Sequence, residues 1–401
     1  MQAMEIRPSS RAQSVKPSPT LSVTARAAAL KAEGRDILSL AAGEPDFDTP
    51  EFIKEAAVKA LKNGFTKYTA VDGTPGLKKA IVEKFARENR LRYATDEILV
   101  SCGCKHSIYN LLQALLNDGD EVIIPAPYWV SYPDMALLAG GRPVIIEAGI
   151  GEGFKITPAK LAAAITPRSR LFILNSPSNP TGVRYTAAEL AALGAVLEKS
   201  PQVVIASDDI YEHILWEGDG FTNIVNVCPA LKERTVVLNG VSKAYSMTGW
   251  RIGFAAGTRA IIAAMNKIQS QSTSNPTSIA QAAAQAALEG DQSFVREQCR
   301  VFKERHDYVL RRLNAMKGVE CLPAQGTFYI FPNMQRAMTA LGLADDIQLG
   351  EWFLERTGCA MVPGSAFGAP GCMRISFATS MQVLEDAMDR MTKALGNSAN
   401  A

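Results

Sequence analysis

The feature that most constrains the fold is a series of short, continuous apolar runs in the middle of the chain. They are dominated by Val, Ile, Leu and Ala and lack the polar–apolar alternation of a half-exposed strand. Strands buried on both faces have this composition, and they occur in mainly parallel sheets covered by helices. The runs lie at 98–100, 121–124, 143–146, 171–174, 203–206, 235–238 and 252–256. We therefore predict an α/β fold with a mainly parallel central sheet.

The pattern changes on both sides of this region. The first 45 residues look like an arm, in which Lys16-Pro-Ser-Pro-Thr20 breaks regular structure and 24–34 forms a short helix. After Pro276, helical patterns at 292–317, 347–357 and 381–395 combine with strand-like runs at 326–331 and 373–377. We predict an N-terminal arm that is also part of a small domain (1–45), a large cofactor-binding domain (46–300) and a smaller α+β domain (301–401).

Composition excludes several classes of function. Lys+Arg number 42 and Asp+Glu 40, a net charge of +2 without the basic surplus of a nucleic-acid-binding protein. No apolar run approaches a membrane span, and the first residues lack the apolar segment of a signal peptide. Seven cysteines are an odd number without regular spacing, which favours reduced thiols and a cytoplasmic location. With three histidines, we expect no metal site.

Polar residues follow four of the predicted strands. In an open α/β sheet, ligands bind outside the carboxyl ends of the strands, so these residues are expected to converge there. Each segment alone could be a turn or a helix cap, but four together favour a binding site. The segments are Ser101 to Lys105, Asn175 to Gly182, Ser207-Asp-Asp-Ile-Tyr211 and Asn239-Gly-Val-Ser-Lys243.

The residue types in these segments indicate a particular chemistry. They contain no Ser-His-Asp grouping, and the chain has neither a GxGxxG nor a GxxxxGK[ST] motif. Lys243 stands between two apolar runs, where an amine loses charge and can form a Schiff base, whereas a lysine on the surface would stay solvated. An aspartate could hold a pyridinium N–H, and an arginine with a serine could bind a phosphate. Together these groups suit pyridoxal 5'-phosphate.

One motif resembles a known family. Ser242-Lys-Ala-Tyr-Ser-Met-Thr-Gly-Trp-Arg-Ile-Gly253 is similar to the cofactor-lysine motif of class I aminotransferases, which have the fold type I of pyridoxal-phosphate enzymes. The resemblance extends along nearly the whole chain. It includes Gly43-Glu-Pro-Asp-Phe47, Lys67-Tyr-Thr69, Pro127-Tyr-Trp-Val-Ser-Tyr-Pro133, Asn175 to Gly182, Asp208-Asp-Ile-Tyr-Glu212 and Met373-Arg-Ile-Ser376.

The resemblance implies three catalytic residues. Lys243 would carry the cofactor as a Schiff base and then act as the base that moves the substrate's proton. Asp208 would pair with the protonated pyridine nitrogen and keep the ring an electron sink, and we interpret the adjacent Asp209 as a structural cap. Tyr211, together with Asn179, would hydrogen-bond the phenolic oxygen of the cofactor.

The remaining site residues follow from the same resemblance. Trp129 would stack on the cofactor ring and Arg374 would bind the substrate α-carboxylate bidentately. Gly43 would add a backbone contact to the substrate, which Trp129 and Asn179 would also touch. Tyr68 would reach the phosphate of a neighbouring subunit, which implies a homodimer with shared active sites. The phosphate of the same subunit would meet Ser242, Arg251, Gly103 and Cys104 at the start of a helix.

The chain departs from the family pattern in two features. Gly240 stands three residues before Lys243, where many relatives carry Ser or Thr, so that one phosphate hydroxyl is missing. Cys102 and Cys104 occupy small or polar positions of the phosphate loop.

The substrate prediction depends on two lysines. In the bacterial aspartate aminotransferases that the chain resembles, a lysine at the position of Lys105 meets the distal carboxylate of the substrate; the alternative is one more charge that neutralises phosphate. Lys16 matches a lysine that accompanies activity on prephenate. We predict ping-pong transfer of an amino group from L-aspartate to 2-oxoglutarate, with prephenate or aromatic amino acids as alternatives. A C–S lyase and a sensor domain of a DNA-binding regulator are less favoured.

Overall fold

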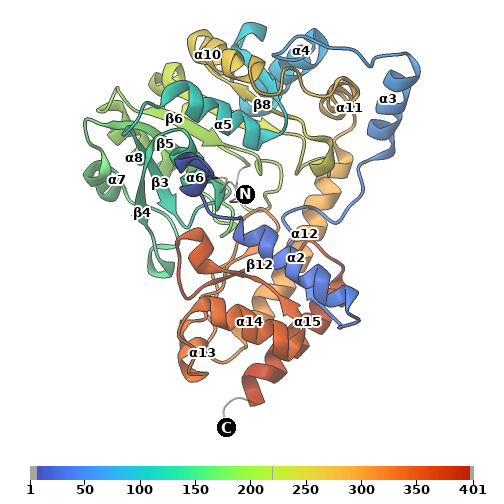
Figure 1. Cartoon of the computed structure of the whole chain (residues 1–401), viewed down its shortest axis with the longest axis vertical. Coiled ribbons are helices and arrows are strands. Elements are labelled where there is room, and N and C mark those ends of the chain that lie inside the picture. Colours follow the sequence, from blue (N-terminus) through green and yellow to red (C-terminus); the bar gives the residue numbers. More distant parts are fainter. Residues whose placement is uncertain (1–6, 219, 398–401) are drawn as a thin grey trace, which may run out of the picture.

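The computed structural model describes residues 7–218 and 220–397, which form a large sheet with helices on both faces and a smaller unit of helices and short strands (Figure 1). The strand order of the large sheet is β2-β8-β7-β6-β5-β3-β4; β8 is antiparallel to its neighbours and all other pairs are parallel. The prediction of a mainly parallel sheet is therefore confirmed. Its strands are β2 (Ile98–Ser101), β3 (Glu121–Ala126), β4 (Arg142–Glu147), β5 (Ser169–Asn175), β6 (Val204–Asp208), β7 (Thr235–Gly240) and β8 (Gly253–Ala256).

Apart from the partly exposed edge strand β4, both faces of the sheet are buried. Successive side chains of a strand point to opposite faces. Leu99 packs on one side with Ile108 and Met265 from the covering helices, whereas Val100 packs on the other side with Leu77 and Ala283. A strand in this position needs apolar residues throughout, which explains the continuous runs. The helices on the first face are α5 (Cys104–Leu115) and α10 (Arg259–Ser270); those on the second include α4 (Pro75–Lys84), α7 (Pro158–Ala164), α8 (Ala187–Glu198) and α11 (Ser278–Glu289).

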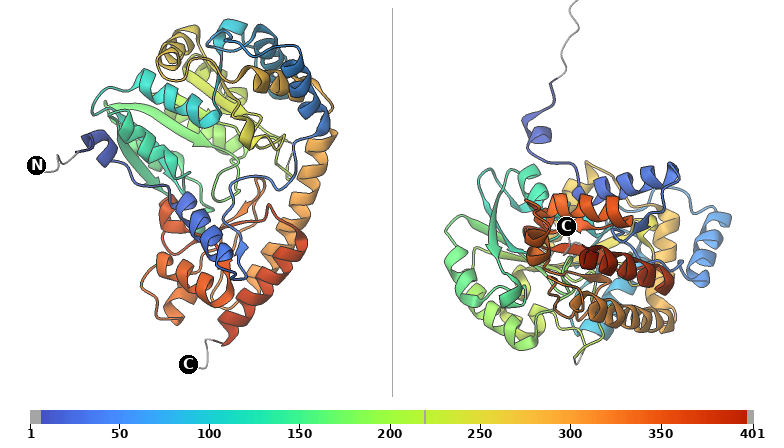
Figure 2. Two further views of the ribbon diagram at one scale, coloured as in Figure 1. Left: turned by 45° about the vertical axis from the view of Figure 1, so that its right-hand side comes forward. Right: turned by 90° about the horizontal axis from the view of Figure 1, so that it is seen from below.

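The smaller unit joins both ends of the chain. β1 (Leu38–Ser39) pairs with β10 (Cys359–Ala360), and an antiparallel sheet has the order β11-β12-β9. The long helix α12 (Ser293–Asn314) lies beside α15 (Met381–Asn397) (Figure 2). Residue 300 lies inside α12, and the predicted domain boundary there stays a prediction. The short strands are β9 (Tyr329–Ile330), β11 (Val362–Pro363) and β12 (Met373–Ser376).

The other helices are short or lie at the edges of the two units. None of the described helices combines the length and apolar character that a membrane span requires. The α-helices are α1 (Ser10–Gln13), α2 (Pro19–Ala32), α3 (Glu51–Lys62), α6 (Ser131–Leu138), α9 (Ile224–Val227), α13 (Gln335–Ala340) and α14 (Asp346–Thr357). The other helical turns are η1 (Phe85–Asn89), η2 (Thr95–Glu97), η3 (Ile150–Glu152), η4 (Pro229–Arg234), η5 (Thr248–Trp250) and η6 (Gly364–Phe367).

Two predicted elements differ from the structure. The helix expected over 24–34 is α2, which begins at Pro19 and not at 24, because proline fits the first turn of a helix, where its missing N–H is not needed. The strand expected over 326–331 is reduced to β9, because Thr327 has φ 67° and cannot continue an extended ladder.

An ion pair fixes the loop that follows β1. The guanidinium of Arg305 on α12 donates to both carboxylate oxygens of Asp46 at 2.7 and 2.9 Å, and it lies 5.4 Å from the ring centre of Phe47. Arg305 is buried, and a bidentate pair of this kind is stronger than a solvated one. The contact ties the N-terminal loop to the long helix shared by the two units.

We predict that Asp46→Asn lowers the free energy of unfolding by about 1–3 kcal/mol, because it leaves a buried guanidinium without its charged partner. Urea unfolding followed by circular dichroism measures the change. Asp48→Asn, an exposed aspartate two residues away, is the matched control and is expected to change stability by less than about 0.5 kcal/mol. Equal effects of the two substitutions would contradict the importance of the pair.

Candidate active site

A cavity of about 420 Å³ lies at the carboxyl ends of the parallel strands. Its walls come from the segments that follow β2, β5, β6 and β7, from α2, and from the small sheet. These parts of the chain are far apart in the sequence and meet only in the fold. The predicted site residues that line the cavity are Gly43, Cys104, Lys105, Trp129, Asn179, Asp208, Tyr211, Ser242, Lys243, Arg251 and Arg374.

Lys243 projects into the cavity from the turn after β7. Its Nζ donates to the backbone oxygen of Gly43 at 2.6 Å. Burial, assisted by the nearby cations Arg374 and Arg251 and opposed by Glu44, lowers the pKa of Lys243 to about 8. A substantial fraction of the amine is therefore neutral near pH 8, which a nucleophile or base requires.

Asp208 ends β6 on the same side of the cavity and is almost fully buried. Its oxygens accept hydrogen bonds from the Tyr132 hydroxyl at 2.5 Å and from the Cys104 thiol at 3.8 Å. Burial raises the pKa of Asp208 to about 6, although these donors and Lys243 lower it. Asp209 points elsewhere and binds Ser207 and Asn223. Of these two adjacent aspartates, Asp208 is thus the one that lines the cavity.

The start of α5, Arg251 and Ser242 form a corner of the cavity whose groups are suited to an anion. Gly103 caps the helix at φ 88°, and a Cβ there would lie 2.2 Å from the guanidinium of Arg251. Arg251 donates to the backbone oxygens of Thr248 and Cys102, and Ser242 lies buried beside it in the cavity wall. Helix amides, a guanidinium and a hydroxyl together suit a phosphate.

Close packing explains the glycine at position 240. A Cβ on Gly240 would lie 2.9 Å from Cα of Gly253 and 3.0 Å from the backbone oxygen of Ile252. Both are backbone atoms of the neighbouring strand and cannot move aside easily. This backbone therefore has no room for the serine or threonine that many relatives carry there.

Arg374 extends from β12 into the opposite wall and is almost fully buried. Its terminal nitrogens donate to Asn179 Oδ1 at 3.1 Å and to the backbone oxygen of Ala41 at 2.8 Å. Its Nε has no hydrogen-bond partner among the described residues. A buried guanidinium with an unpaired N–H and no carboxylate is suited to a carboxylate ligand. Asn179 is itself held, because its N–H donates to Asn175 Oδ1 at 2.9 Å.

The remaining predicted residues lie at the rim or outside it. Lys105 stands over the Trp129 ring with Nζ 4.8 Å from the ring centre, and burial together with Arg251 lowers its pKa. Lys16 lines an adjacent cavity of about 420 Å³, which also contains Lys105 and Arg251. Tyr68 is 91% exposed and does not line the catalytic cavity. Within this one chain, the structure does not bring Tyr68 and Lys16 to Lys243.

Sequence reasoning missed two tyrosines. Tyr132 contacts Asp208, and it follows Trp129 by three residues in a quoted motif, a spacing that offered a usable signal. Tyr329 lies in the cavity wall with its hydroxyl 3.3 Å from that of Tyr211. No local pattern distinguishes Tyr329 from a core aromatic residue.

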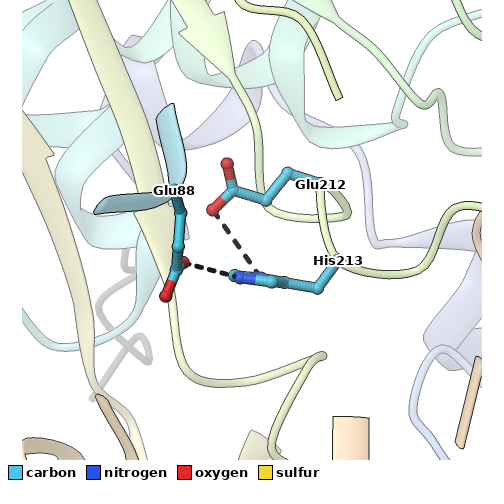
Figure 3. Close-up of side chains that lie close together, drawn as sticks. All are labelled: Glu88, Glu212 and His213. Atoms are coloured by element: carbon cyan, nitrogen blue, oxygen red, sulfur yellow. Dashed lines mark hydrogen bonds and ion pairs between the residues drawn. The ribbon is translucent and has the colours of Figure 1, made fainter. Parts of the chain in front are cut away.

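A second group of titratable residues lies outside this site. Glu88, Glu212 and His213 have their possible ligand atoms within 4.8 Å of one another (Figure 3). Glu88 and His213 line a larger cavity of about 600 Å³ beside α12, which contains none of the predicted site residues. Glu212 already accepts hydrogen bonds from three buried side chains, Lys84, Asn89 and Asn239. We interpret the group as a structural ion-pair network.

The chain matches a protein family over most of its length. The model of "Aminotransferase class I and II" covers residues 35–391. The chain belongs to this family. It is an aminotransferase, and the fold is that of the family, as its resemblance to the cofactor-lysine motif implied.

Individual relatives agree with this assignment. The chain is 58% identical over 393 residues to an aspartate/prephenate aminotransferase of Nitrosomonas europaea, covering 96% of this chain and 99% of the relative. It is 55% identical over 382 residues to one of Cereibacter sphaeroides, covering 94% and 96%. The crystal structure of the aspartate aminotransferase of Rhizobium meliloti superposes with a TM-score of 0.93 at 48% identity, covering 98% and 99%. The aspartate aminotransferase of Thermus thermophilus with maleate has a TM-score of 0.92 at 41% identity, covering 97% and 100%.

Because the pKa of Asp208 is raised, we predict that this residue lowers the stability of the ligand-free protein in a pH-dependent way. Between the ordinary pKa of 3.8 and about 6, the folded state holds a proton that the unfolded state has lost, so stability falls as the pH rises through this window. Asp208→Asn removes that cost. We expect it to raise the free energy of unfolding of the ligand-free protein by about 2–3 kcal/mol at pH 8 and by almost nothing at pH 4.

Chemical unfolding at both pH values, after dialysis against an amine that strips bound carbonyl compounds, measures the difference. Asp118→Asn, at an exposed aspartate, is the control and is expected to give no pH-dependent gain. A gain for Asp208→Asn that is equal at pH 4 and pH 8 would contradict the explanation.

Proposed function

We propose that the chain transfers the amino group of L-aspartate to 2-oxoglutarate, with pyridoxal phosphate held in the cavity. The observation that carries the proposal is the placement of Lys243, Asp208 and Arg374 around one cavity. Among the described residues, none of the three forms a direct ion pair with a side chain of opposite charge. An amine of lowered pKa, a buried carboxylate and a buried guanidinium are three groups that such a reaction requires.

The residues present fit the cofactor. Asp208 is a buried carboxylate whose direct donors are neutral, so a pyridinium N–H would compensate its charge. The corner formed by Ser242, Arg251 and the first amides of α5 would hold the phosphate, and Trp129 would cover a ring face. Bound pyridoxal phosphate supplies an electron sink that stabilises negative charge at the substrate Cα.

The chain's own groups would bind and orient the substrate. Arg374 would fix the α-carboxylate through its unpaired N–H groups, and Gly43 would add a backbone contact. Lys243 in its neutral form would take the proton from the substrate Cα, and its lowered pKa makes that form accessible near pH 8. Tyr211 would keep its proton and donate a hydrogen bond to the phenolic oxygen of the cofactor. Ser18, Thr20 and Leu21 at the start of α2 line the entrance and would limit access of water.

Aspartate is the preferred substrate of the proposal. Lys105 projects beside Trp129 at the rim, where a second carboxylate of the substrate would meet a cation. Prephenate is the second candidate, because relatives at 58% and 55% identity bear the name aspartate/prephenate aminotransferase. Lys16 lies next to Lys105 in the adjacent cavity, which would place its charge near the far end of a longer dicarboxylate.

Steady-state kinetics test the proposal. We expect kcat/KM to be highest for aspartate or prephenate, and lower for tyrosine and alanine. Wild-type protein is expected to absorb between about 360 and 430 nm. Lys243→Ala is expected to abolish turnover, because the chain then lacks the amine that moves the substrate's proton. Lys105→Ala is expected to lower kcat/KM for aspartate about tenfold or more and to leave alanine nearly unchanged, because only aspartate has a second carboxylate. A wild-type preference for alanine or tyrosine would contradict the aspartate assignment.

A parallel assay distinguishes the lyase alternative. A C–S lyase would release pyruvate from cystathionine without an added keto acid. We expect no such release from the purified protein, and rapid release would favour the lyase over the aminotransferase.

We further propose a homodimer with shared active sites. Tyr68 is 91% exposed, and the preceding helix α3 and its loop also expose apolar residues, Val58, Leu61 and Phe65. Helix α3 lies on the upper unit, away from α14 (Figure 1). Exposed apolar side chains that lie close in sequence to an exposed tyrosine suit contact with a second copy of this chain. Tyr68 would then reach the neighbouring phosphate corner.

Sedimentation equilibrium tests the dimer. We expect a mass near twice 43.2 kDa for the wild-type chain, and a shift toward the single chain for Leu61→Glu, because a buried carboxylate opposes association. Ile347→Glu on α14 is the matched control, since Ile347 is 53% and Leu61 54% exposed. A single-chain mass for wild-type protein would contradict shared sites.

A further inference from the structure

Tyr329 occupies a position between two of the groups to which the reaction is assigned. It is 1% exposed and lines the catalytic cavity. Its hydroxyl accepts a hydrogen bond from the Tyr211 hydroxyl at 3.3 Å. The centre of its ring lies 4.4 Å from Cζ of Arg374. One side chain thus contacts the residue expected to hold the cofactor's phenolic oxygen and the residue expected to hold the substrate carboxylate.

The backbone holds Tyr329 firmly. Tyr329 pairs with Ser376 in the ladder between β9 and β12. The preceding turn contains Thr327 at φ 67°, a conformation that a β-branched residue rarely adopts. The turn is fixed from both sides, because the Thr327 N–H donates to Ile214 at 2.8 Å and its hydroxyl accepts from the Tyr329 N–H at 3.1 Å. Such strain persists where the surrounding structure imposes a position on nearby side chains.

The hydroxyl of Tyr329 can increase the donor strength of Tyr211. Burial raises the pKa of both tyrosines, so each keeps its proton. When Tyr211 donates to a ligand oxygen, its own oxygen is free to accept, and the Tyr329 hydroxyl lies within reach to donate to it. Two hydroxyls in series polarise each other, which strengthens the hydrogen bond at the end of the chain.

The ring of Tyr329 acts on a different group. The guanidinium of Arg374 lies over this ring and 5.1 Å from the ring centre of Phe367. Its hydrogen bonds to Asn179 and Ala41 fix two nitrogens, but they leave the tilt of the plane to the aromatic neighbours. A cation held on a ring face keeps its edge directed toward the cavity, where a carboxylate would bind.

We propose that Tyr329 is a positioning residue with two separable actions: its hydroxyl tunes Tyr211, and its ring orients Arg374. The inference rests on the proposed function, because both actions are defined toward the cofactor and a carboxylate substrate. Since Tyr329 belongs to the small sheet and Tyr211 follows a strand of the large one, the contact also sets the position of Arg374 relative to Lys243.

Two substitutions separate the actions. Tyr329→Phe removes the hydroxyl and keeps the ring, and Tyr329→Leu removes both. Two readouts are taken on the holoenzyme without turnover: the pKa obtained by titrating the absorbance of the bound cofactor, and the Kd of maleate, a non-reacting dicarboxylate, from the change in that absorbance. Tyr329→Met is made alongside Tyr329→Leu, so that the loss of the ring is tested in a second side chain of greater length.

We expect Tyr329→Phe to raise the absorbance pKa by about 0.5 to 1 unit, because a weaker donor at Tyr211 stabilises the deprotonated imine less. Its Kd for maleate is expected to stay within about twofold of the wild-type value, because the cation–ring contact is retained. Tyr329→Leu and Tyr329→Met are expected to show the same pKa shift and a Kd for maleate that is about 5- to 30-fold higher.

Tyr185→Phe is the matched control. Tyr185 is also a buried tyrosine, and its hydroxyl accepts one hydrogen bond, from the Ile156 N–H at 2.9 Å, outside the cavity. The control is expected to leave both readouts unchanged. An unchanged pKa in Tyr329→Phe, or an equal rise in the Kd for maleate in Tyr329→Phe and Tyr329→Leu, would overturn the inference while wild-type turnover upholds the proposed function. A wild-type protein without cofactor absorbance would overturn both.

Discussion

The site depends on charges that the fold buries without directly pairing them. Asp208 ends β6 and Lys243 lies in the turn after the adjacent strand β7, and both line one cavity. Burial raises the pKa of the carboxyl to about 6 and lowers that of the amine to about 8. On a flexible segment, either side chain would turn toward water, and its pKa would then stay near the ordinary value. The packing of the buried sheet therefore offsets the free-energy cost of burying these two groups.

A neighbouring group of charges shows the contrast. Glu212 follows Asp208 by four residues and is also buried, yet its oxygens accept from Lys84 and two asparagines, and its pKa is lowered. The end of β6 and the turn after it thus carry one carboxylate that a buried lysine pairs and one that no cation among the described residues pairs directly. This difference, more than burial itself, separates a structural charge from a functional one.

Much of this arrangement could be predicted because it follows from local chemistry. The continuous apolar runs predicted the strands within a few residues, and the polar segments after them predicted which side chains line the cavity. The start of α2 was placed too late because the tolerance of a helix for proline at its first position outweighed the breaking tendency of Lys16-Pro-Ser-Pro. The strand over 326–331 was too long because the left-handed Thr327 is set by tertiary contacts with the turn after β6.

The sequence by itself determined the fold class through the periodicity of its apolar runs and the family through the resemblance of its motifs, because both are local properties of the chain. It also supplied the proposal for the reacting groups. Only the tertiary structure decided the partners of those groups. Tyr132 and Cys104 meet Asp208, and Tyr329 meets Tyr211 across 118 residues of sequence. Such contacts depend on how helices and strands that are distant in the sequence pack together, and the spacing of residues within one segment carries no information about them.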